Sequence, residues 1–159
     1  MRYLGLLAVC SVLLSMNVRA DDSNTASGTV NMGDKYNLEI KHVYLLSAAE
    51  GEDKGRRLIF SPIDIAAVID GCATISCVMD ELDEGMELQL DTGKNMTLRG
   101  VANEGRFGDF STLDRSWLKT TSDTPNAVDG VLAHDHSHLG GGMVTNIEFK
   151  ARLTKAFSR

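Results

Sequence analysis

The fold is decided by the alternating stretch Tyr36-Asn37-Leu38-Glu39-Ile40-Lys41-His42-Val43-Tyr44-Leu45-Leu46. Every second position from Tyr36 to Leu46 carries an apolar or aromatic side chain or His42, and polar side chains alternate with them in the first half. A period of two places successive side chains on opposite faces of an extended chain. We therefore predict a half-buried strand over residues 36–46.

Shorter stretches of the same kind follow toward the C-terminus. Turns rich in glycine and aspartate separate them, such as Gly51–Gly55 and the one that begins at Asp91. Short strands punctuated in this way are typical of an antiparallel sandwich or barrel. We expect an all-β, mainly antiparallel fold, a sandwich or small barrel of about eight strands. The expected strands after the first cover residues 57–60, 86–90, 96–99, 107–110, 117–121, 131–135 and 147–153.

One segment has the features of a short helix. Ser61 is suited to an N-cap, Pro62 to the first helical position and Asp64 to the positive end of the helix dipole. We expect about two turns over residues 63–69, ending near Gly71.

The N-terminus is typical of a secretory signal peptide. Arg2 precedes a short apolar run over residues 3–14, and the small residue Ala20 precedes two aspartates. About a dozen apolar residues are too few to cross a membrane as a helix. We expect residues 1–20 to be a signal peptide, 21–28 a flexible leader and 29–159 a single β-rich domain. An N-terminal core helix, or lipidation at Cys10, is the alternative.

The charge of the chain excludes some partners. The formal net charge is −6, and removal of residues 1–20, which include Arg2 and Arg19 and no acidic residue, gives −6 − 2 = −8. A negative balance argues against binding to nucleic acid or to an anionic membrane surface. We expect an exported protein, periplasmic in a Gram-negative cell and otherwise extracellular.

Two cysteines remain after the signal peptide, Cys72 and Cys77. A single pair in an oxidising compartment predicts a disulfide. The bond requires Cα atoms within about 4.4–6.8 Å, which neither a strand nor a helix provides at this spacing. Residues 73–76 must therefore double back. A reactive or metal-binding thiol pair is the alternative.

The most suggestive cluster for chemistry is His134-Asp135-His136-Ser137-His138. On a strand the three imidazoles project from one face at intervals of ~6.7 Å, and neutral imidazole is a ligand for zinc or copper. Asp123, Asp129 or Glu148 could complete the metal shell. The alternative is a solvated hairpin end that turns at residues 140–142. We expect His42 to be a core histidine, and Trp117 to be a core residue or a stacking platform.

Five acidic residues lie close together in the sequence. Their density permits a calcium site, but the spacing of an EF-hand loop is absent. A solvated negative edge is the other interpretation. The five are Asp80, Glu81, Asp83, Glu84 and Glu87.

Four stretches together resemble a group of small exported bacterial proteins. They are Gly28-Thr29-Val30, residues 61–77, Glu84-Gly85-Met86 and residues 141–149. The resemblance covers most of the chain after residue 20 and includes no catalytic motif. It implies a bacterial, exported protein and no particular activity.

These observations favour a non-enzymatic function. The sequence has no Gly-x-Ser-x-Gly, phosphate-binding loop or Cys-x-x-Cys motif. We expect an exported β-domain that binds a small ligand or a protein partner in the cell envelope and has no obligatory cofactor. One alternative is a metal-binding protein that uses His134, His136 and His138. Another is a small hydrolase or isomerase whose catalytic residues the sequence does not identify.

Overall fold

The computed structural model describes residues 23–32, 36–51, 53–91, 95–102, 105–135 and 142–158. Within these ranges no helix is both long enough and apolar enough to cross a membrane. The expected signal peptide, residues 1–20, lies outside the described residues.

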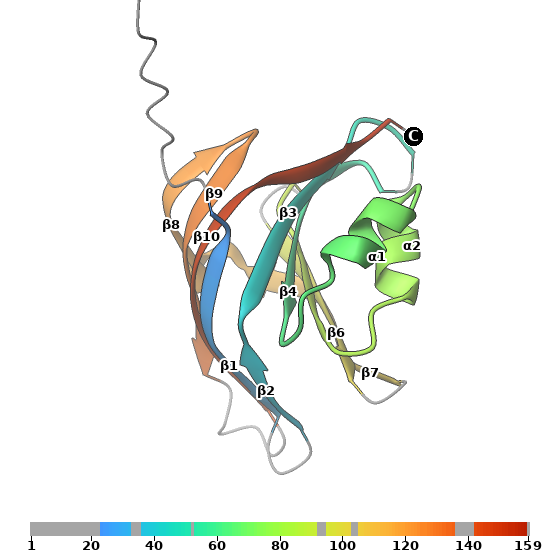
Figure 1. Cartoon of the computed structure of the whole chain (residues 1–159). Helices are drawn as coiled ribbons and strands as arrows, with labels where there is room; N and C mark the ends of the chain where they lie inside the picture. The colour runs from blue at the N-terminus through green and yellow to red at the C-terminus, as the bar shows by residue number, and fades with distance from the viewer. Residues whose placement is uncertain are drawn as a thin grey trace, which may run out of the picture.

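The described chain is mostly strand, which confirms the prediction of an all-β fold (Figure 1). It contains ten strands rather than about eight, two short α-helices rather than one, and the 3-10 turn Arg115–Trp117. The elements are β1 (Thr25–Met32), β2 (Tyr36–Ile40), β3 (His42–Ala48), β4 (Gly55–Ser61), α1 (Ala66–Gly71), α2 (Ile75–Asp80), β5 (Gly85–Gln89), β6 (Asn95–Ala102), β7 (Gly105–Asp114), β8 (Leu118–Thr124), β9 (Ala127–Asp135) and β10 (Met143–Phe157).

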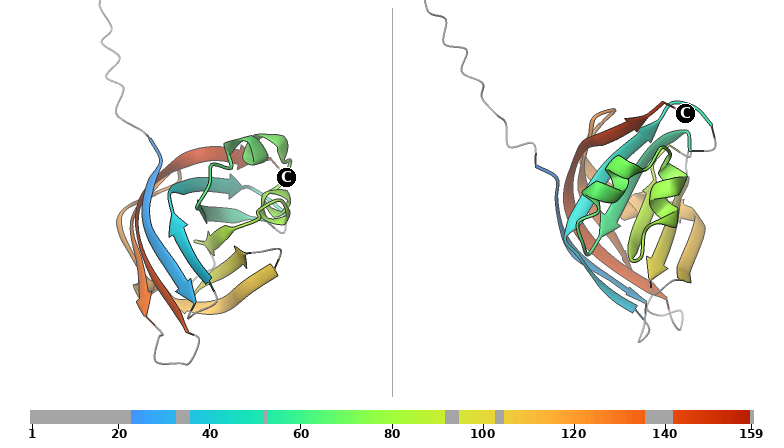
Figure 2. Two further views of the ribbon diagram at one scale, coloured as in Figure 1. Left: turned by 60° about the horizontal axis from the view of Figure 1, so that its bottom comes forward. Right: turned by 45° about the vertical axis from the view of Figure 1, so that its right-hand side comes forward.

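All ten strands form one curved sheet with two halves that share β10. The first half runs β2-β1-β10-β9-β8 and is antiparallel throughout. The second runs β10-β3-β4-β5-β6-β7, and its β10–β3 pairing is parallel. Figure 2 shows the two halves curving around a common interior. The described strand path ends at β2 and β7, which do not pair, so the barrel is not closed.

Two apolar clusters lie on the two faces of the second half. The inner cluster joins both halves, with Phe60 and Phe149 packed edge to face at 5.2 Å between ring centroids. The outer cluster lies between β3–β4 and the two helices, and includes Leu46, Ile59 and Ile69. Consequently β3 has both faces covered, and residues 43–46 are all buried.

The single strand predicted over residues 36–46 is instead two strands, β2 and β3, which is a correction. They meet at Lys41, whose backbone N–H donates to the carbonyl of Ser61 (3.1 Å). Before Lys41 the even position Ile40 faces the inner cluster, and after it the odd position Leu45 does. The alternation seemed unbroken because Tyr44 and the even positions after it face the outer cluster, which is apolar too.

The flexible leader predicted for residues 21–28 is also corrected, because residues 25–28 belong to β1. This strand pairs with β10 on one side and β2 on the other. Its exposed positions are polar, and its inward positions are the small residues Ala26 and Gly28, followed by the buried Val30. Small inward residues make the alternation too weak to recognise as a strand.

The helical region differs from the prediction in two ways. Helix α1 begins at Ala66 rather than near Ile63, because Ser61 belongs to β4 and the Asp64 carboxylate accepts the N–H of Ala66 (2.9 Å). A second helix, α2, was not predicted. It begins after Thr74, whose hydroxyl accepts the N–H of Cys77 (3.1 Å) as an N-cap.

The expected reversal between the cysteines is present. Cys72 ends α1, Cys77 lies in α2, and their Cα atoms are 5.6 Å apart, with the sulfur atoms at disulfide distance. The ammonium group of Lys155, on β10, donates to the carbonyls of Ile69 (2.7 Å) and Cys72 (2.7 Å). The reversed segment is therefore joined both to itself and to the sheet.

The first prediction concerns the close approach of β1 and β10. A Cβ on Gly28 would lie 2.0 Å from the backbone oxygen of Asn146, and φ there is +154°. We expect Gly28→Ala to lower the free energy of unfolding by about 2–3 kcal/mol, measured by urea denaturation. The control is Gly71→Ala, where the new Cβ meets no described atom within 4 Å. We expect this control either to leave the free energy of unfolding unchanged or to raise it by up to about 1 kcal/mol. Equal effects of the two changes would contradict this packing.

The second prediction concerns the cysteines. Replacing both Cys72 and Cys77 with serine should lower the free energy of unfolding by roughly 2 kcal/mol, because the unfolded chain loses a short cross-link. Reductant should lower the free energy of unfolding of the wild type by a similar amount and leave that of the double variant unchanged. A wild type that does not respond to reductant, and that contains two titratable thiols, would mean that the bond is not formed.

Candidate functional site

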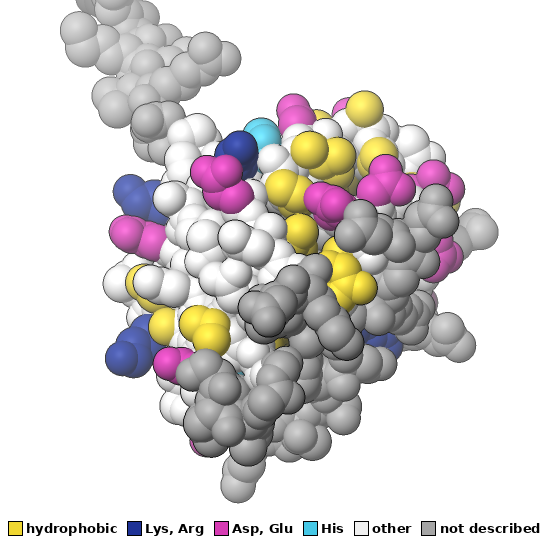
Figure 3. All heavy atoms as spheres, turned by 90° about the horizontal axis from the view of Figure 1, so that it is seen from below, with side chains coloured by type: hydrophobic (Ala, Val, Ile, Leu, Met, Phe, Trp, Pro, Cys, Tyr) yellow, Lys and Arg dark blue, Asp and Glu magenta, His cyan; other side chains and the backbone are white. Residues whose placement is uncertain are grey.

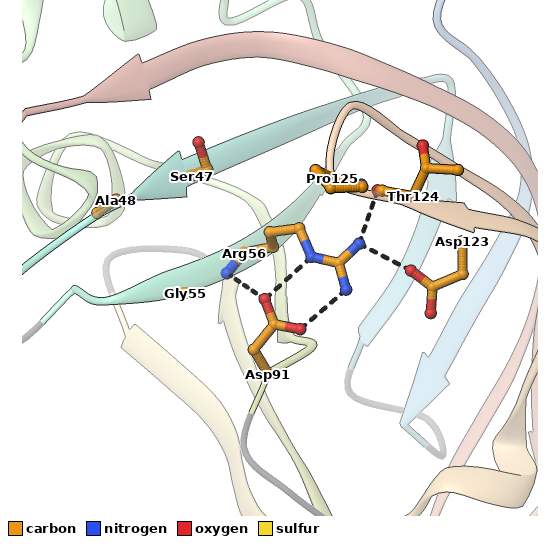
Figure 4. A pocket seen from close by; sticks show the side chains of 8 residues that line it. All are labelled: Ser47, Ala48, Gly55, Arg56, Asp91, Asp123, Thr124 and Pro125. Carbon is orange, nitrogen blue, oxygen red and sulfur yellow. Dashed lines mark hydrogen bonds and ion pairs between the residues drawn. The ribbon is translucent and has the colours of Figure 1, made fainter.

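A cleft of about 510 Å³ lies between the β3–β4 and β8–β9 hairpins. We call it the Arg56 cleft. Four separate segments contribute to it, namely the end of β3, the start of β4, the residue after Leu90, and the end of β8 with the turn that follows (Figure 4). Its lining residues are Ser47, Ala48, Gly55, Arg56, Asp91, Asp123, Thr124 and Pro125.

The guanidinium group of Arg56 lies at the centre of the cleft and is held by two carboxylates. Its Nε and Nη2 donate to the two oxygens of Asp91, at 2.9 and 2.8 Å. Its Nη1 donates to Asp123 Oδ1 (2.7 Å) and to the carbonyl of Thr124 (2.8 Å). The backbone N–H of Arg56 also donates to Asp91 (3.0 Å). Figure 4 shows the carboxylates converging on the guanidinium from two directions.

These contacts fix the charge state of the cleft. The hydrogen bond from Arg56 holds the pKa of the Asp91 carboxyl below its usual value of 3.8, and the same bond raises the pKa of Arg56. Arg115 adds a second cation, with Nη2 3.4 Å from Asp123 Oδ2. The Asp91 carboxylate is therefore anionic near neutral pH, and arginine side chains align both carboxylates.

The exposure of these groups decides what the cleft offers to a ligand. The Arg56 side chain is 16% exposed, whereas those of Asp91 and Asp123 are 39% and 31% exposed. Most N–H groups of Arg56 are already used, but carboxylate oxygens have further lone pairs. The cleft therefore presents mainly hydrogen-bond acceptors.

The polar side chains of the described lining, apart from Arg56, are carboxylates and hydroxyl groups. This described lining contains no histidine or cysteine, and its hydroxyl groups are those of Ser47 and Thr124. A general base near neutral pH needs a pKa close to 7, whereas the pKa of Asp91 is lowered. The arrangement is better suited to binding than to acid–base chemistry.

The predicted histidine cluster is described only at its first member. His134, on β9, is half-buried and stacks on the ring of Trp117, with an interplanar angle of 18°. His136 and His138 lie outside the described residues. Among the described residues no three His, Cys, Asp or Glu side chains are placed to hold a metal. The zinc or copper site stays a prediction.

Several other predicted residues have different surroundings from those expected. His42 is half-buried beside Tyr44, with ring centroids 6.4 Å apart, rather than in the core. Of the three acids proposed for a metal shell, Asp123 is held by Arg56 and Asp129 by Arg152. Glu148 is exposed on β10.

The acidic residues 80–87 do not form a single surface. Asp80, Glu81 and Asp83 are exposed, in agreement with a solvated edge, and Glu84 is half-buried. Figure 3 shows acidic side chains gathered beside a group of apolar ones on one face of the molecule. Glu87 is buried in β5 beside Arg57. The edge interpretation is wrong for this residue, because the face of β5 that carries it is covered.

Arg56 and Asp91 were not predicted as site residues, and Glu87 was considered only as part of a calcium site or a solvated edge. Arg56 lies between the predicted turn at 51–55 and the predicted strand at 57–60, Asp91 begins a predicted turn, and no local signal relates positions 35 residues apart. A weak signal existed for Glu87, since arginines occur on both neighbouring strands, at Arg57 and Arg99.

Comparisons of the chain with protein-family models, with curated proteins and with solved structures find no match.

The third prediction follows from the lowered pKa of Asp91. A lowered pKa in the folded state means that the ionised carboxylate stabilises the fold above pH ~4, and that this contribution is lost as the pH falls through the folded-state value, below 3.8. We expect Asp91→Asn to cost up to about 1 kcal/mol at pH 7, because the pair is partly exposed, and less at pH 3. Urea denaturation at several pH values measures this. The exposed control Asp83→Asn should show a smaller loss; equal, pH-independent losses would contradict the Arg56–Asp91 interaction.

Proposed function

We propose that this protein is an exported, non-enzymatic binding domain and that the Arg56 cleft holds a small ligand that donates several hydrogen bonds. The observation that carries the proposal is a cleft of about 510 Å³ around a guanidinium group held on two sides by carboxylates. Ligand sites of small molecules commonly measure about 300–1,000 Å³.

The immobilised arginine supports binding because it preorganises the acceptors. Asp91 and Asp123 are held in place before any ligand arrives, so a ligand need not order them. A site that must first order its own side chains loses affinity to that cost. The Arg56 network therefore favours a recognition role for the partly exposed carboxylate oxygens.

The charge and shape of the lining support a particular ligand class. The exposed polar atoms are mainly carboxylate oxygens, which accept hydrogen bonds from amines and hydroxyl groups and repel anions. Ala48 and Pro125 add apolar contact surface. The net charge of the chain, −6, also favours a cationic or neutral ligand over an anionic one. Amines and polyhydroxylated molecules fit these requirements.

Export is part of the proposal and is supported by separate features. The first twenty residues are typical of a signal peptide. Cys72 and Cys77 lie at disulfide distance, which is compatible with an oxidising compartment. An exported protein would therefore encounter ligands of the cell envelope or the surrounding medium.

The fourth prediction tests this cleft with defined probes. A polyamine, a neutral sugar and inorganic phosphate are titrated into the protein without residues 1–20 and followed through backbone amide shifts in NMR. We expect the amine or the sugar to bind saturably, with the largest shifts at Ser47, Arg56 and Thr124, and phosphate not to bind there. Asp123→Asn should weaken binding at least tenfold, since a charge-assisted hydrogen bond is lost.

The matched control is Asp129→Asn, in the same β8–β9 hairpin. Asp129 is also paired with an arginine, Arg152, but does not line the cleft. Its loss should leave the affinity within about twofold of the wild type. Saturable binding of phosphate alone at these amides, or equal weakening by the two variants, would refute the proposed ligand class.

A further inference from the structure

A second, smaller cavity lies on the other face of the second half-sheet, beside α2. It measures about 170 Å³ and is lined almost entirely by polar side chains, which come from β4, β5, β6, α2 and the turn before β4. We call it the Glu87 pocket. Its lining residues are Asp53, Arg57, Ser76, Met79, Asp80, Glu87, Gln89 and Arg99.

Glu87 is the most unusual group in this pocket. Its side chain is only 3% exposed, and its Oε1 lies 2.8 Å from Nε of Arg57, which is 5% exposed. Its other oxygen, Oε2, has no hydrogen-bond partner among the described residues, and Nη1 of Arg99 lies 3.9 Å from it. Burial raises the pKa of the Glu87 carboxyl. A buried carboxylate oxygen without a donor is costly, and native structures rarely leave one unsatisfied.

Two buried donors of the lining residues also lack a hydrogen-bond partner among the described residues, Nε of Arg57 and Nε of Arg99. The lining thus contains a carboxylate oxygen that lacks a donor and guanidinium N–H groups that lack an acceptor, and Glu87 and Arg99 are directly paired on adjacent strands. A single molecule with both kinds of group would satisfy both.

The other charges narrow the ligand class. Two guanidinium groups, Arg57 and Arg99, disfavour a bare metal ion, and no metal-binding group of three occurs among the described residues. The carboxylates of Asp53, Asp80 and Glu87 disfavour a simple anion. Asp53 is already engaged, since it accepts the N–H (3.0 Å) and the hydroxyl group (2.7 Å) of Ser76.

We propose that the Glu87 pocket binds a small zwitterion, an α-amino acid with a short side chain. Its ammonium group would donate to Glu87 Oε2 and its carboxylate would accept from Arg99. The volume, about 170 Å³, is roughly ten times what a single ordered water needs, and is too small for most drug-sized ligands. This site is independent of the Arg56 cleft, because Arg56 and Arg57 are on opposite faces of β4.

The experiment uses four probes, glycine, L-alanine, acetate and methylammonium, titrated into the protein without residues 1–20. Binding is followed by NMR at the Nε–H signal of Arg99 and at the backbone amides of Ser76 and Gln89. Glycine or alanine should shift these signals saturably. Acetate and methylammonium, which each carry only one of the two charges, should bind at least tenfold more weakly.

Two variants and a control locate the site. Glu87→Gln removes the buried charge and should abolish glycine binding. Arg99→Gln should do so as well, and this change is milder for folding because Arg99 is 38% exposed. The control Arg152→Gln removes an arginine that is 29% exposed and lines neither cavity, and it should retain wild-type affinity. The inference is overturned if neither amino acid shifts these signals, if acetate or methylammonium binds as tightly, or if Arg99→Gln behaves like the control.

Discussion

Strand β10 is hydrogen-bonded on both sides over residues 144–150, to β1 and to β9, and then continues along β3 in the parallel direction. It is therefore the element through which the two halves of the sheet are held together. Ile147 and Phe149 contribute to the inner cluster, and Phe157 contributes to the outer one. Because the strand passes from one half to the other, the second half is covered on one face by the first half and on the other by the helices. Because both faces of the second half are covered, apolar side chains occupy both faces of β3, and the charged residues Arg57 and Glu87 are buried.

The strands that the sequence predicted well are those with one solvated face. In β10, buried and exposed residues alternate over residues 145–151, where the sequence predicted a strand at 147–153. Where both faces of a strand are covered by apolar clusters, the sequence does not show which side chains point to the inner cluster. The switch at Lys41, from even to odd inward positions, could therefore not be predicted. Strand β1 was not predicted because its inward residues Ala26 and Gly28 are small, so its apolar and polar positions do not clearly alternate. Helix α2 follows Thr74, and its six residues are too few to show helical periodicity.

The candidate sites were beyond prediction because their residues are distant in sequence. Asp91 and Asp123 lie 35 and 67 positions after Arg56 in the sequence. Each of the three residues looks locally like an ordinary turn or strand end. Only the pairing of β4 with β5, and the packing of the β8–β9 hairpin, bring them together. Glu87 was interpreted as part of a calcium site or of a solvated edge, because an acidic residue is almost never fully buried unless it is paired. Its partner, Arg57, is visible only once the register of β4 and β5 is known.

Both sites depend on that same register. Successive side chains of β4 face opposite sides, so Arg56 reaches the cleft while Arg57 reaches the Glu87 pocket, and each contacts a carboxylate in or just after β5. A slip of one residue would exchange the faces of the two arginines and separate each from its present carboxylate partner. Leu58 and Leu88 are paired across β4 and β5 and are both fully buried. This pair opposes such a slip, because the slip would break the apolar contact between them. The apolar register of two central strands thus determines where two neighbouring positive charges are placed, and with them both candidate binding sites.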